Sequence, residues 1–233
     1  MPALTANPVL LDAAARHRLD GEGYLVLPGA VPAGWIGPLC AAFDAGVIPS
    51  DQWPVPRQRE WRHAQVDLDP LVQRVCRLPV LIAAAAHLIG GPFFLAQVEG
   101  REPCRGNAAQ PLHRDGTDGQ GQAVVAMVWL DGYGADNGAT QLVPGRHRGD
   151  VAAAAMGAAQ VVSGAAGDIL VFHPDVLHGA TTNHSGARRR SLLLSYAAAA
   201  LHAQYRATEA LRGVRMDTGA LLGDAAPGNG AGA

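Results

Sequence analysis

Residues 110–116 (QPLHRDG) contain a histidine and an aspartate separated by one residue. In an extended segment side chains alternate between two faces, so His113 and Asp115 point to one side while Arg114 points to the other. An imidazole nitrogen and a carboxylate oxygen on the same side of a strand are two ligands for a divalent metal, and this donor set suits iron. The pair alone occurs often by chance, and a surface turn is the alternative interpretation.

A third ligand could come from residues 167–179 (GDILVFHPDVLHG) or from the residues that follow them. A Gly-Asp turn begins a short apolar run there, which predicts a buried strand that ends at histidines. His173, His178 and His184 are all candidates. The strand pattern does not choose among them.

Three consecutive arginines begin the last strongly apolar run, SLLLSY. By alternation, Arg189 shares the more polar face with Ser191 and Ser195, whereas Arg188 and Arg190 share the face of the leucines. One face of a sandwich lines the interior cavity, so Arg189 is the arginine that we expect to point inward. The alternative for the triplet is a solvated basic segment at a strand start.

The order of these motifs, HxD, a distal histidine and then an arginine, resembles the iron(II)/2-oxoglutarate oxygenases, and more narrowly the phytanoyl-CoA dioxygenase family. The resemblance covers nearly the whole chain through DGEGYLVLPGAV, QPLHRDG, VWLDGYGADNGATQLVPGRHR and GDILVFHPDVLHGATTNHSGARRRSLLLSY. In that family an arginine typically follows the distal histidine by eleven positions, and an asparagine by five. His178, Asn183 and Arg189 have this spacing, so the resemblance selects His178 over the other two histidines.

The resemblance implies that His113, Asp115 and His178 hold Fe(II) as the catalytic metal ligands, with 2-oxoglutarate and O2 as cosubstrates. It also implies that Arg189 pairs with the far carboxylate of 2-oxoglutarate, since a guanidinium offers bidentate hydrogen bonds and stays protonated when buried. Halogenating relatives carry a small residue in place of the metal-binding aspartate. The presence of Asp115 therefore favours hydroxylation, or another outcome of hydrogen abstraction, over halogenation.

Four further residues are candidate contacts of the cosubstrate. Gln110 could donate an amide hydrogen bond to it, or could bond backbone at a strand edge. Thr140 could add a hydroxyl and Gln97 an amide. Trp129 lies in a run that is apolar on both faces, where core packing is the first expectation and contact with the cosubstrate the second.

Residues 49–64 are rich in proline, tryptophan and arginine without a clear period, which predicts an ordered loop. If the loop covers the mouth of the barrel, as front loops do in this family, Trp53, Arg57 and Trp61 could bind a planar or anionic substrate by stacking and charge. The alternative is a loop that packs its tryptophans on the scaffold. Arg101, Arg105 and Arg146 are further candidates at the rim.

The elements that must position these residues are mainly strands, with helices in front. Residues 8–20, 32–45 and 70–89 are predicted to be helical, the last with a break at Pro79, and residues 21–29 contain a short strand. From Phe93 onward, short apolar runs separated by Gly, Pro, Asn and Asp predict antiparallel strands.

We therefore expect a mainly β fold with flanking helices in one domain, residues 1–222. Its parts would be a helical front half (1–92), a β core (93–200) and a C-terminal segment (201–222), followed by a flexible tail (223–233). The resemblance implies that the core is a double-stranded β-helix, the jelly roll of cupin-like proteins.

The composition narrows the partners and the compartment. Of the 233 residues, 48% are hydrophobic, and the net charge of −2 provides no basic excess for nucleic acid. All 18 basic residues are arginines, which excludes Schiff-base chemistry on a lysine. No secretory signal or membrane-spanning run is visible, and the three cysteines are widely spaced. We expect a cytoplasmic protein that binds neither nucleic acid nor membrane.

Taken together, these features predict an Fe(II)- and 2-oxoglutarate-dependent dioxygenase. It would hydroxylate, or otherwise oxidise by hydrogen abstraction, a small organic molecule, in specialised-metabolite biosynthesis by family analogy. One alternative is a cupin-like metalloenzyme that does not use 2-oxoglutarate, in which Arg189 has no role. Another is a non-catalytic small-molecule-binding protein on the same fold. The sequence leaves the substrate, the position oxidised and the oligomeric state open.

Overall fold

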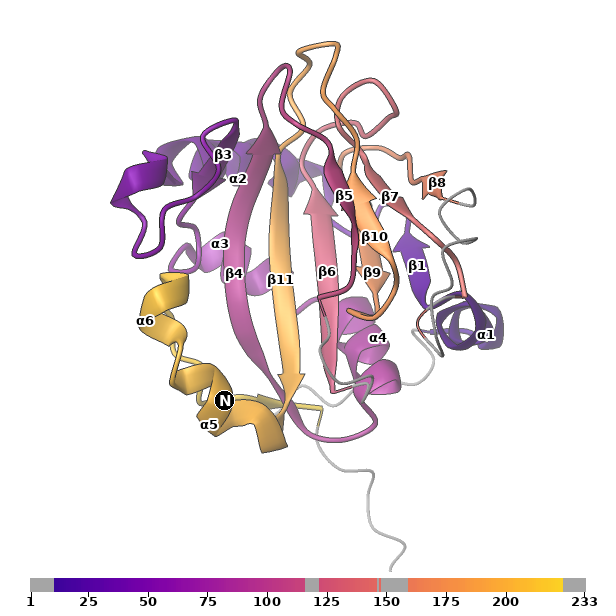
Figure 1. Ribbon diagram of the computed structural model, residues 1–233. Helices are drawn as coiled ribbons and strands as arrows, with labels where there is room; N and C mark the ends of the chain where they lie inside the picture. Colours follow the sequence, from indigo (N-terminus) through magenta and orange to yellow (C-terminus); the bar gives the residue numbers. More distant parts are fainter. Residues whose placement is uncertain (1–10, 116–121, 146, 148–158, 224–233) are drawn as a thin grey trace, which may run out of the picture.

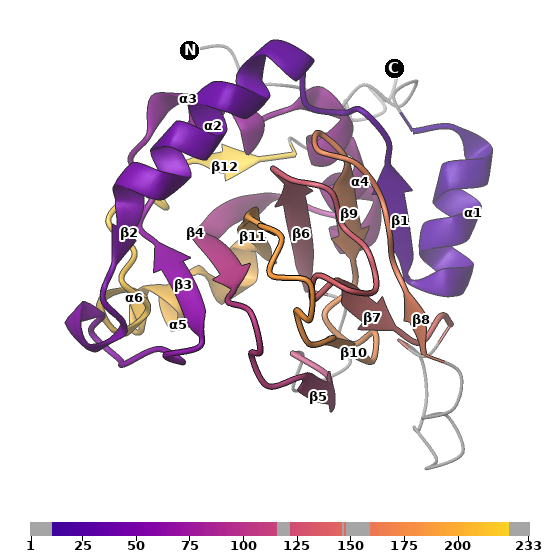
Figure 2. The same ribbon diagram turned by 90° about the horizontal axis from the view of Figure 1, so that it is seen from above.

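The computed structural model describes residues 11–115, 122–145, 147 and 159–223. In these ranges the chain forms two antiparallel sheets that enclose a cavity, with helices against the larger sheet (Figure 1). Figure 2 shows the two sheets from above, with the short strands of the smaller sheet beside the long strands of the larger one. This is the jelly roll that the resemblance implies.

The larger sheet has eight strands, and two of them pair with different ends of the same edge of β4. Its order is β1 (Tyr24–Leu27), β9 (Ile169–Phe172), β6 (Ala123–Trp129), β11 (Ser191–Ala198), β4 (Phe93–Pro103), β3 (Trp61–Ala64) and β2 (Val47–Ile48), with β12 (Leu221–Leu222) also on β4. The order in the smaller sheet is β5 (Gln110–His113), β10 (His178–Ala180), β7 (Thr140–Leu142) and β8 (Gln160–Val161).

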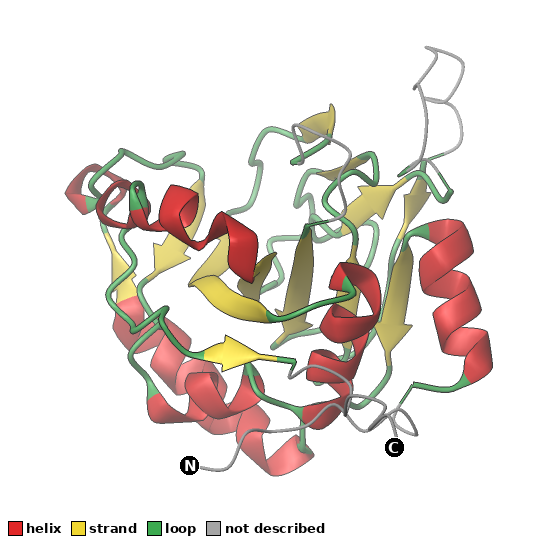
Figure 3. Ribbon diagram, turned by 90° about the horizontal axis from the view of Figure 1, so that it is seen from below, coloured by secondary structure: helices red, strands yellow, loops and turns green. Residues whose placement is uncertain are grey.

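The helices lie mainly in the front part and at the C-terminal end (Figure 3). They are α1 (Ala13–Glu22), α2 (Ala33–Gly46), α3 (Pro70–Val75), α4 (Pro79–Ile89), α5 (His202–Arg206) and α6 (Glu209–Arg212), with 3-10 turns at Ser50–Gln52 and Ala199–Leu201. Two helices replace the predicted helix 70–89, which confirms the break at Pro79. The ring of a proline occupies the first turn of α4, where no backbone donor is needed.

Alternation along the central strands separates two apolar layers. Val124, Ala126 and Val128 of β6 pack with the front helices, whereas Val125 and Met127 face the space between the sheets. Burying each large apolar side chain in these layers contributes about 1.5–3 kcal/mol. The helices therefore cover one face of the larger sheet and leave the other face free for the cavity.

The packing of α2 on the sheet depends on a glycine. A Cβ atom at Gly100 of β4 would lie only 2.7 Å from the Phe43 ring, and 2.8 Å from the Cβ of Ala64. Phe43 is fully buried. The absence of a side chain on this face of β4 is what lets the ring of Phe43 contact the strand.

The front part contributes strands as well as helices. β1 lies within the strand predicted at residues 21–29 and pairs with β9, which confirms that strand, whereas β3, in the segment predicted to be a loop, pairs with β4. The short segment WRHA (β3) has no apolar alternation that would reveal a strand, and it is fixed instead by pairing with the edge of β4. The C-terminal segment likewise adds β12 to this edge. Apart from Gly223, the predicted flexible tail lies outside the described residues.

Across the parts of the chain that the structure describes, no helix is both long enough and apolar enough to span a membrane.

Candidate active site

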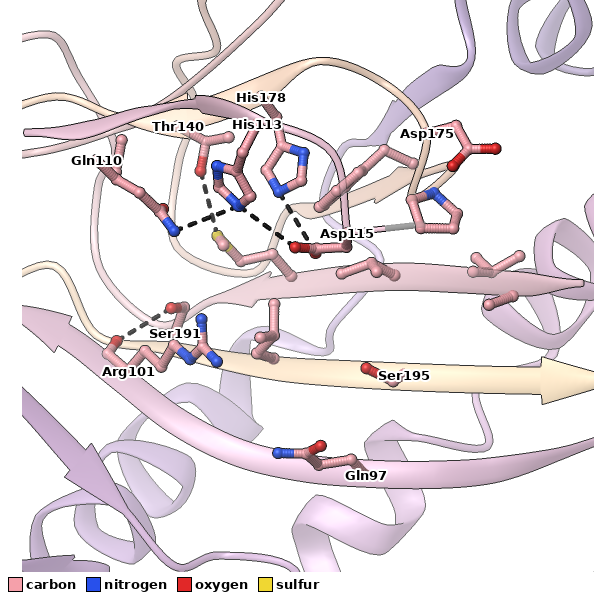
Figure 4. Close-up of a pocket in the computed structure, with 18 of the residues that line it drawn as sticks. Gln97, Arg101, Gln110, His113, Asp115, Thr140, Asp175, His178, Ser191 and Ser195 are labelled. Atoms are coloured by element: carbon pink, nitrogen blue, oxygen red, sulfur yellow. Dashed lines mark hydrogen bonds and ion pairs between the residues drawn. The ribbon is translucent and has the colours of Figure 1, made fainter. Parts of the chain in front are cut away.

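Two neighbouring strands of the smaller sheet bring the histidines together. His113 ends β5 and His178 begins β10, and the two residues are direct partners in the antiparallel ladder. Asp115 follows two residues after β5, where its backbone N–H donates to the carbonyl of Pro174, 2.9 Å away. The three side chains consequently converge on one point (Figure 4).

The distances between these side chains fit a metal site. Asp115 Oδ1 lies 3.3 Å from His113 Nε2, and Asp115 Oδ2 lies 3.5 Å from His178 Nε2. All three donor atoms lie within 4.8 Å of one another, and no other such group of His, Cys, Asp or Glu occurs in the described residues. An ion about 2.1 Å from each donor requires donors about 3 Å apart. The site needs only small side-chain shifts to bind one.

Backbone carbonyls fix the orientation of both imidazoles. His113 Nδ1 lies 2.9 Å from the carbonyl of Pro111, and His178 Nδ1 lies 2.9 Å from that of Val176. A carbonyl oxygen only accepts, so each Nδ1 carries the hydrogen and donates it. Each Nε2 then keeps its lone pair for the metal, as is usual for metal-binding histidines.

The electrostatics of the group keep the carboxylate ionised. Burial raises the pKa of Asp115, but interactions with His113 and His178 outweigh it and hold this pKa well below its usual range. The pKa of His113 is raised, chiefly by its hydrogen bond with Asp115. A metal ligand must be deprotonated, and Asp115 meets this condition at neutral pH.

The three side chains open into a cavity of about 410 Å³ between the sheets. Six of the other predicted site residues also line it, and they are Trp61, Gln97, Arg101, Gln110, Thr140 and Arg189. The rim candidate Arg146 lies outside the described residues. Gln110 Nε2 lies 3.4 Å from His113 Nε2, beside the position of a metal. The hydroxyl of Thr140 donates to Met127 Sδ at 3.5 Å. Gln97 Nε2 donates to Glu99 Oε2 at 3.2 Å.

Arg189 lies almost completely buried in the wall of the cavity, 1% exposed. Its Cζ is 4.4 Å from the centre of the Tyr133 ring and 5.7 Å from that of Trp61, and its Nη2 contacts Met127 Sδ at 3.8 Å. Neither Nε nor Nη1 has a hydrogen-bond partner among the described residues. Burial lowers the pKa of this guanidinium. A buried charge without a counter-ion is strongly unfavourable, so the position calls for an anionic ligand.

The two neighbouring arginines have the opposite environment. Arg188 forms ion pairs with Asp44 (2.7 Å) and Glu102 (2.8 Å), and Arg190 pairs with Asp131 (2.8 Å). Both point away from the cavity. The structure thus places the three arginines on the faces that alternation predicts.

Some predicted site residues do not line the cavity, among them the rim candidate Arg105. Trp129 is fully buried in the core and stacks on Tyr133 with ring centres 4.6 Å apart, so it has the packing role that was the first expectation, and not the second, contact with the cosubstrate. Trp53 is buried beneath the loop against Arg57, whose Cζ lies 4.8 Å from its ring. Arg57 is directed to Glu99, 3.1 Å away. The loop therefore packs Trp53 on the scaffold, and of its three candidates Trp61 alone reaches the cavity.

The cavity also contains residues that the sequence did not identify. Met127 belongs to β6, where alternation along the strand could have indicated it. Ser191 and Ser195 of β11 also line the cavity, on the face that alternation assigns to Arg189. Tyr205 and Arg212 come from the short helices α5 and α6. Helices of this length show no periodic pattern, so no sequence signal pointed to their contribution.

Comparisons with known proteins agree with the fold and the site. The family profile of phytanoyl-CoA dioxygenase (PhyH) matches residues 19–191. The L-proline trans-4-hydroxylase of Streptomyces griseoviridis is 27% identical over 83% of this chain and 88% of its own length.

Solved structures share the architecture. AviO1 from Streptomyces viridochromogenes Tue57 is 26% identical, with a TM-score of 0.66 over 82% of this chain and 96% of its own. HygX from Streptomyces hygroscopicus, solved with nickel and 2-oxoglutarate bound, is 17% identical, with a TM-score of 0.69 over 81% of this chain and 88% of its own.

The fold, the two imidazoles and the carboxylate define a non-haem iron oxygenase of the 2-oxoglutarate-dependent class. Within that class, the chain belongs to the phytanoyl-CoA dioxygenase (PhyH) family.

Proposed function

We propose that this protein is an Fe(II)- and 2-oxoglutarate-dependent dioxygenase that hydroxylates a small organic molecule. His113, Asp115 and His178 would hold the metal, and Arg189 would bind the far carboxylate of 2-oxoglutarate. One observation carries the proposal: three side chains that could hold a metal ion line the same cavity as a buried guanidinium that has no ion-pair partner among the described residues.

The protein's part in this chemistry is to hold and orient the reactants. When bound, Fe(II) and 2-oxoglutarate activate O2, and decarboxylation of 2-oxoglutarate to succinate is coupled to oxidation of the substrate. Two imidazoles and one carboxylate leave coordination positions on the ion open for these ligands. The hydrogen bonds from each Nδ1 to a carbonyl keep the imidazoles oriented before the metal binds, which lowers the cost of assembling the site.

Arg189 would orient the cosubstrate from the other end. Its guanidinium lines the cavity and would donate to a carboxylate there, and the Tyr133 and Trp61 rings hold the guanidinium plane in position. Gln110 could donate to 2-oxoglutarate beside the metal, and Thr140 contributes a hydroxyl at the same wall.

Hydroxylation is the outcome that two observations favour. The chain keeps Asp115, which would hold the metal where, as the resemblance implies, halogenating relatives carry a small residue. The relative from Streptomyces griseoviridis is an L-proline trans-4-hydroxylase. Neighbours of the same fold include an epimerase and a carbocyclase from nogalamycin biosynthesis, which supports a role in making a specialised metabolite.

Formation of succinate tests the proposal. The purified protein, loaded anaerobically with Fe(II) and mixed with 2-oxoglutarate and O2, should release succinate, and should do so faster with a substrate present. Without Fe(II) the release should fall to background, and with Arg189→Ala at limiting 2-oxoglutarate it should fall by more than about tenfold. Iron-dependent oxidation without succinate would favour a cupin-like enzyme, and binding of small molecules without any turnover would favour a non-catalytic protein.

A further inference from the structure

A second group of arginines lies on the β4 side of the cavity. Arg101 of β4 and Arg212 of α6 both line it, and Arg57 lies behind them. None of the three is required by the metal or by the site proposed for 2-oxoglutarate. Their partners therefore show what else this wall can bind.

The carboxylate in this group, that of Glu99, is already paired with two arginines. Glu99 is buried and pairs with Arg57 at 3.1 Å and, through a short contact, with Nε of Arg101, while Gln97 Nε2 donates to it at 3.2 Å. Burial raises the pKa of Glu99, but Arg101 and Arg57 lower it to below its usual value. One ionised carboxylate thus lies between two guanidinium groups.

Arg101 has hydrogen-bond donors that no described residue uses. Its Nε is bound to Glu99, but its two terminal nitrogens make no hydrogen bond to any residue that the structure describes. The side chain is 33% exposed and lines the cavity. Two N–H edges of a planar guanidinium are consequently open to a ligand, which is the geometry that matches a carboxylate.

Arg212 adds a positive charge to this wall, and its hydrogen-bond acceptors are neutral. Its Nη1 donates to the carbonyl of Ala96 (3.0 Å) and to Gln97 Oε1 (3.1 Å), and its Nη2 donates to the carbonyl of Tyr205 (2.8 Å). These acceptors are neutral, and no carboxylate of the described chain lies within ion-pair distance of Arg212. The wall therefore contains three guanidinium groups and one carboxylate.

We propose that the substrate carries a carboxylate, which Arg101 binds through its free terminal nitrogens while Arg212 supplies further positive charge. This inference rests on the proposed function and names the substrate class of the same site. The acids that line the cavity within the described ranges are Asp115, a metal ligand, and Asp175, which lies 3.7 Å from His173. On the β4 wall no acid is left for a cationic group, whereas an anion would find unpaired charge.

The test measures binding to protein loaded with Ni(II), which replaces iron without turnover, and with saturating 2-oxoglutarate. Matched acids and amides serve as probes: L-proline with L-prolinamide, and benzoate with benzamide, each followed by ligand-observed NMR at millimolar concentration. At least one acid should bind, and its amide should bind more than about fivefold more weakly, because it lacks the charge that Arg101 recognises. Amides that bind as well as their acids, or no binding by either acid, would overturn the inference.

Variants then assign the contact to a residue. Arg101→Gln should weaken binding of the acid by more than about tenfold, and Arg101→Lys, which keeps the charge but loses the fork, by less. Glu99 keeps Arg57 as a partner in both variants. Arg206→Gln on α5, an exposed arginine of the same segment as Arg212, is the matched control and should bind the acid as the unaltered protein does.

Binding of 2-oxoglutarate separates this inference from the proposed function. If Arg101→Gln loses 2-oxoglutarate and not the acid, Arg101 serves the cosubstrate and the inference is wrong. If the unaltered Ni(II) protein does not bind 2-oxoglutarate at all, the proposed function itself fails.

Discussion

The two walls of the cavity are built differently. The wall with the metal ligands comes from the short strands β5 and β10, and its polar groups are satisfied by one another and by nearby backbone carbonyls. The wall opposite comes from the long strands β4 and β11, whose other face is packed by helices, and it holds Arg189, which has no ion-pair partner in the parts of the chain that the structure describes.

The two walls hold their polar side chains in position by different means. Irregular short strands can hold a metal because each ligand is fixed locally, by its ladder partner and its own hydrogen bond. An unpaired buried charge needs a rigid surrounding instead, since a flexible one would let water or a neighbouring acid reach it. The regular, heavily packed sheet provides that surrounding.

The largest effect should follow from removing a ligand on the metal side. Asp115→Ala and His178→Ala should each lower iron-dependent succinate formation by more than about 100-fold, a loss above that typical of residues that merely support a metal ligand. Turnover and bound iron, measured on the same sample, check this. His184→Ala changes an exposed histidine and should leave both unchanged. Full activity in either ligand variant would remove that residue from the site.

Removing the unpaired charge on the opposite wall should have a smaller and more selective effect. Arg189→Ala should raise the KM for 2-oxoglutarate by more than about tenfold, because a hydrogen bond to a charged group contributes about 1.5–3 kcal/mol. Arg188→Ala and Arg190→Ala remove arginines that already have acidic partners, so their KM should change less than about twofold. Equal effects from all three variants would contradict the distinction between inward and outward arginines.

The rigidity of the large sheet can be tested at its packed face. Gly100→Ala would place a methyl group 2.7 Å from the Phe43 ring and should lower the free energy of unfolding by about 1–3 kcal/mol, the usual cost of overpacking. Urea unfolding measures this. Gly34→Ala on α2, where nothing lies within 4 Å of the added methyl group, should be neutral or slightly stabilising. If both variants unfold alike, close contact at β4 is not what stabilises this face.

The smallest effect concerns His63, which lies on β3 beside the arginine-rich wall. Burial lowers its pKa from 6.5 to about 4. Since the unfolded chain binds the proton more tightly, its contribution to stability is complete above pH 6.5 and is lost as the pH falls toward 4. Between pH 7 and 5.5 this should cost about 1 kcal/mol.

His63→Phe keeps a ring against Trp53 and removes the titration. Urea unfolding at the two pH values should therefore show a smaller loss on acidification for the variant than for the unaltered protein. An equal loss would assign the pH dependence to other groups.

Sequence reasoning succeeded where a local rule applied. Alternation along the last strand places Arg189 inward and its neighbours outward, and the break at Pro79 follows from the chemistry of proline. The choice of His178 over His173 needed the spacing of a known family, because nothing in the local pattern distinguishes them.

Sequence reasoning left open, or missed, the placements that contacts between distant segments decide. The type of a tryptophan does not reveal whether it faces a cavity, and Trp53 and Trp129 are both packed in the scaffold. The strand β3 exists because β4 offers it an edge, and Arg212 reaches the cavity because α6 folds back against β4. Such placements depend on segments more than 35 residues apart in the chain, as in the hydrogen bond of Arg212 to Ala96 with a separation of 116.

One edge of β4 pairs with two segments that are far apart in the sequence. β3 pairs with Gly100–Pro103, and β12 pairs with Phe93–Phe94. Together they occupy backbone groups that would otherwise be open to a strand of another molecule. A chain truncated before Leu221 would keep every residue of the proposed site. It would, however, leave backbone N–H and C=O groups of β4 unpaired at Phe93 and Phe94, where a strand of another molecule could bind. The main expected effect of such a truncation is self-association of the protein and not a loss of catalytic activity.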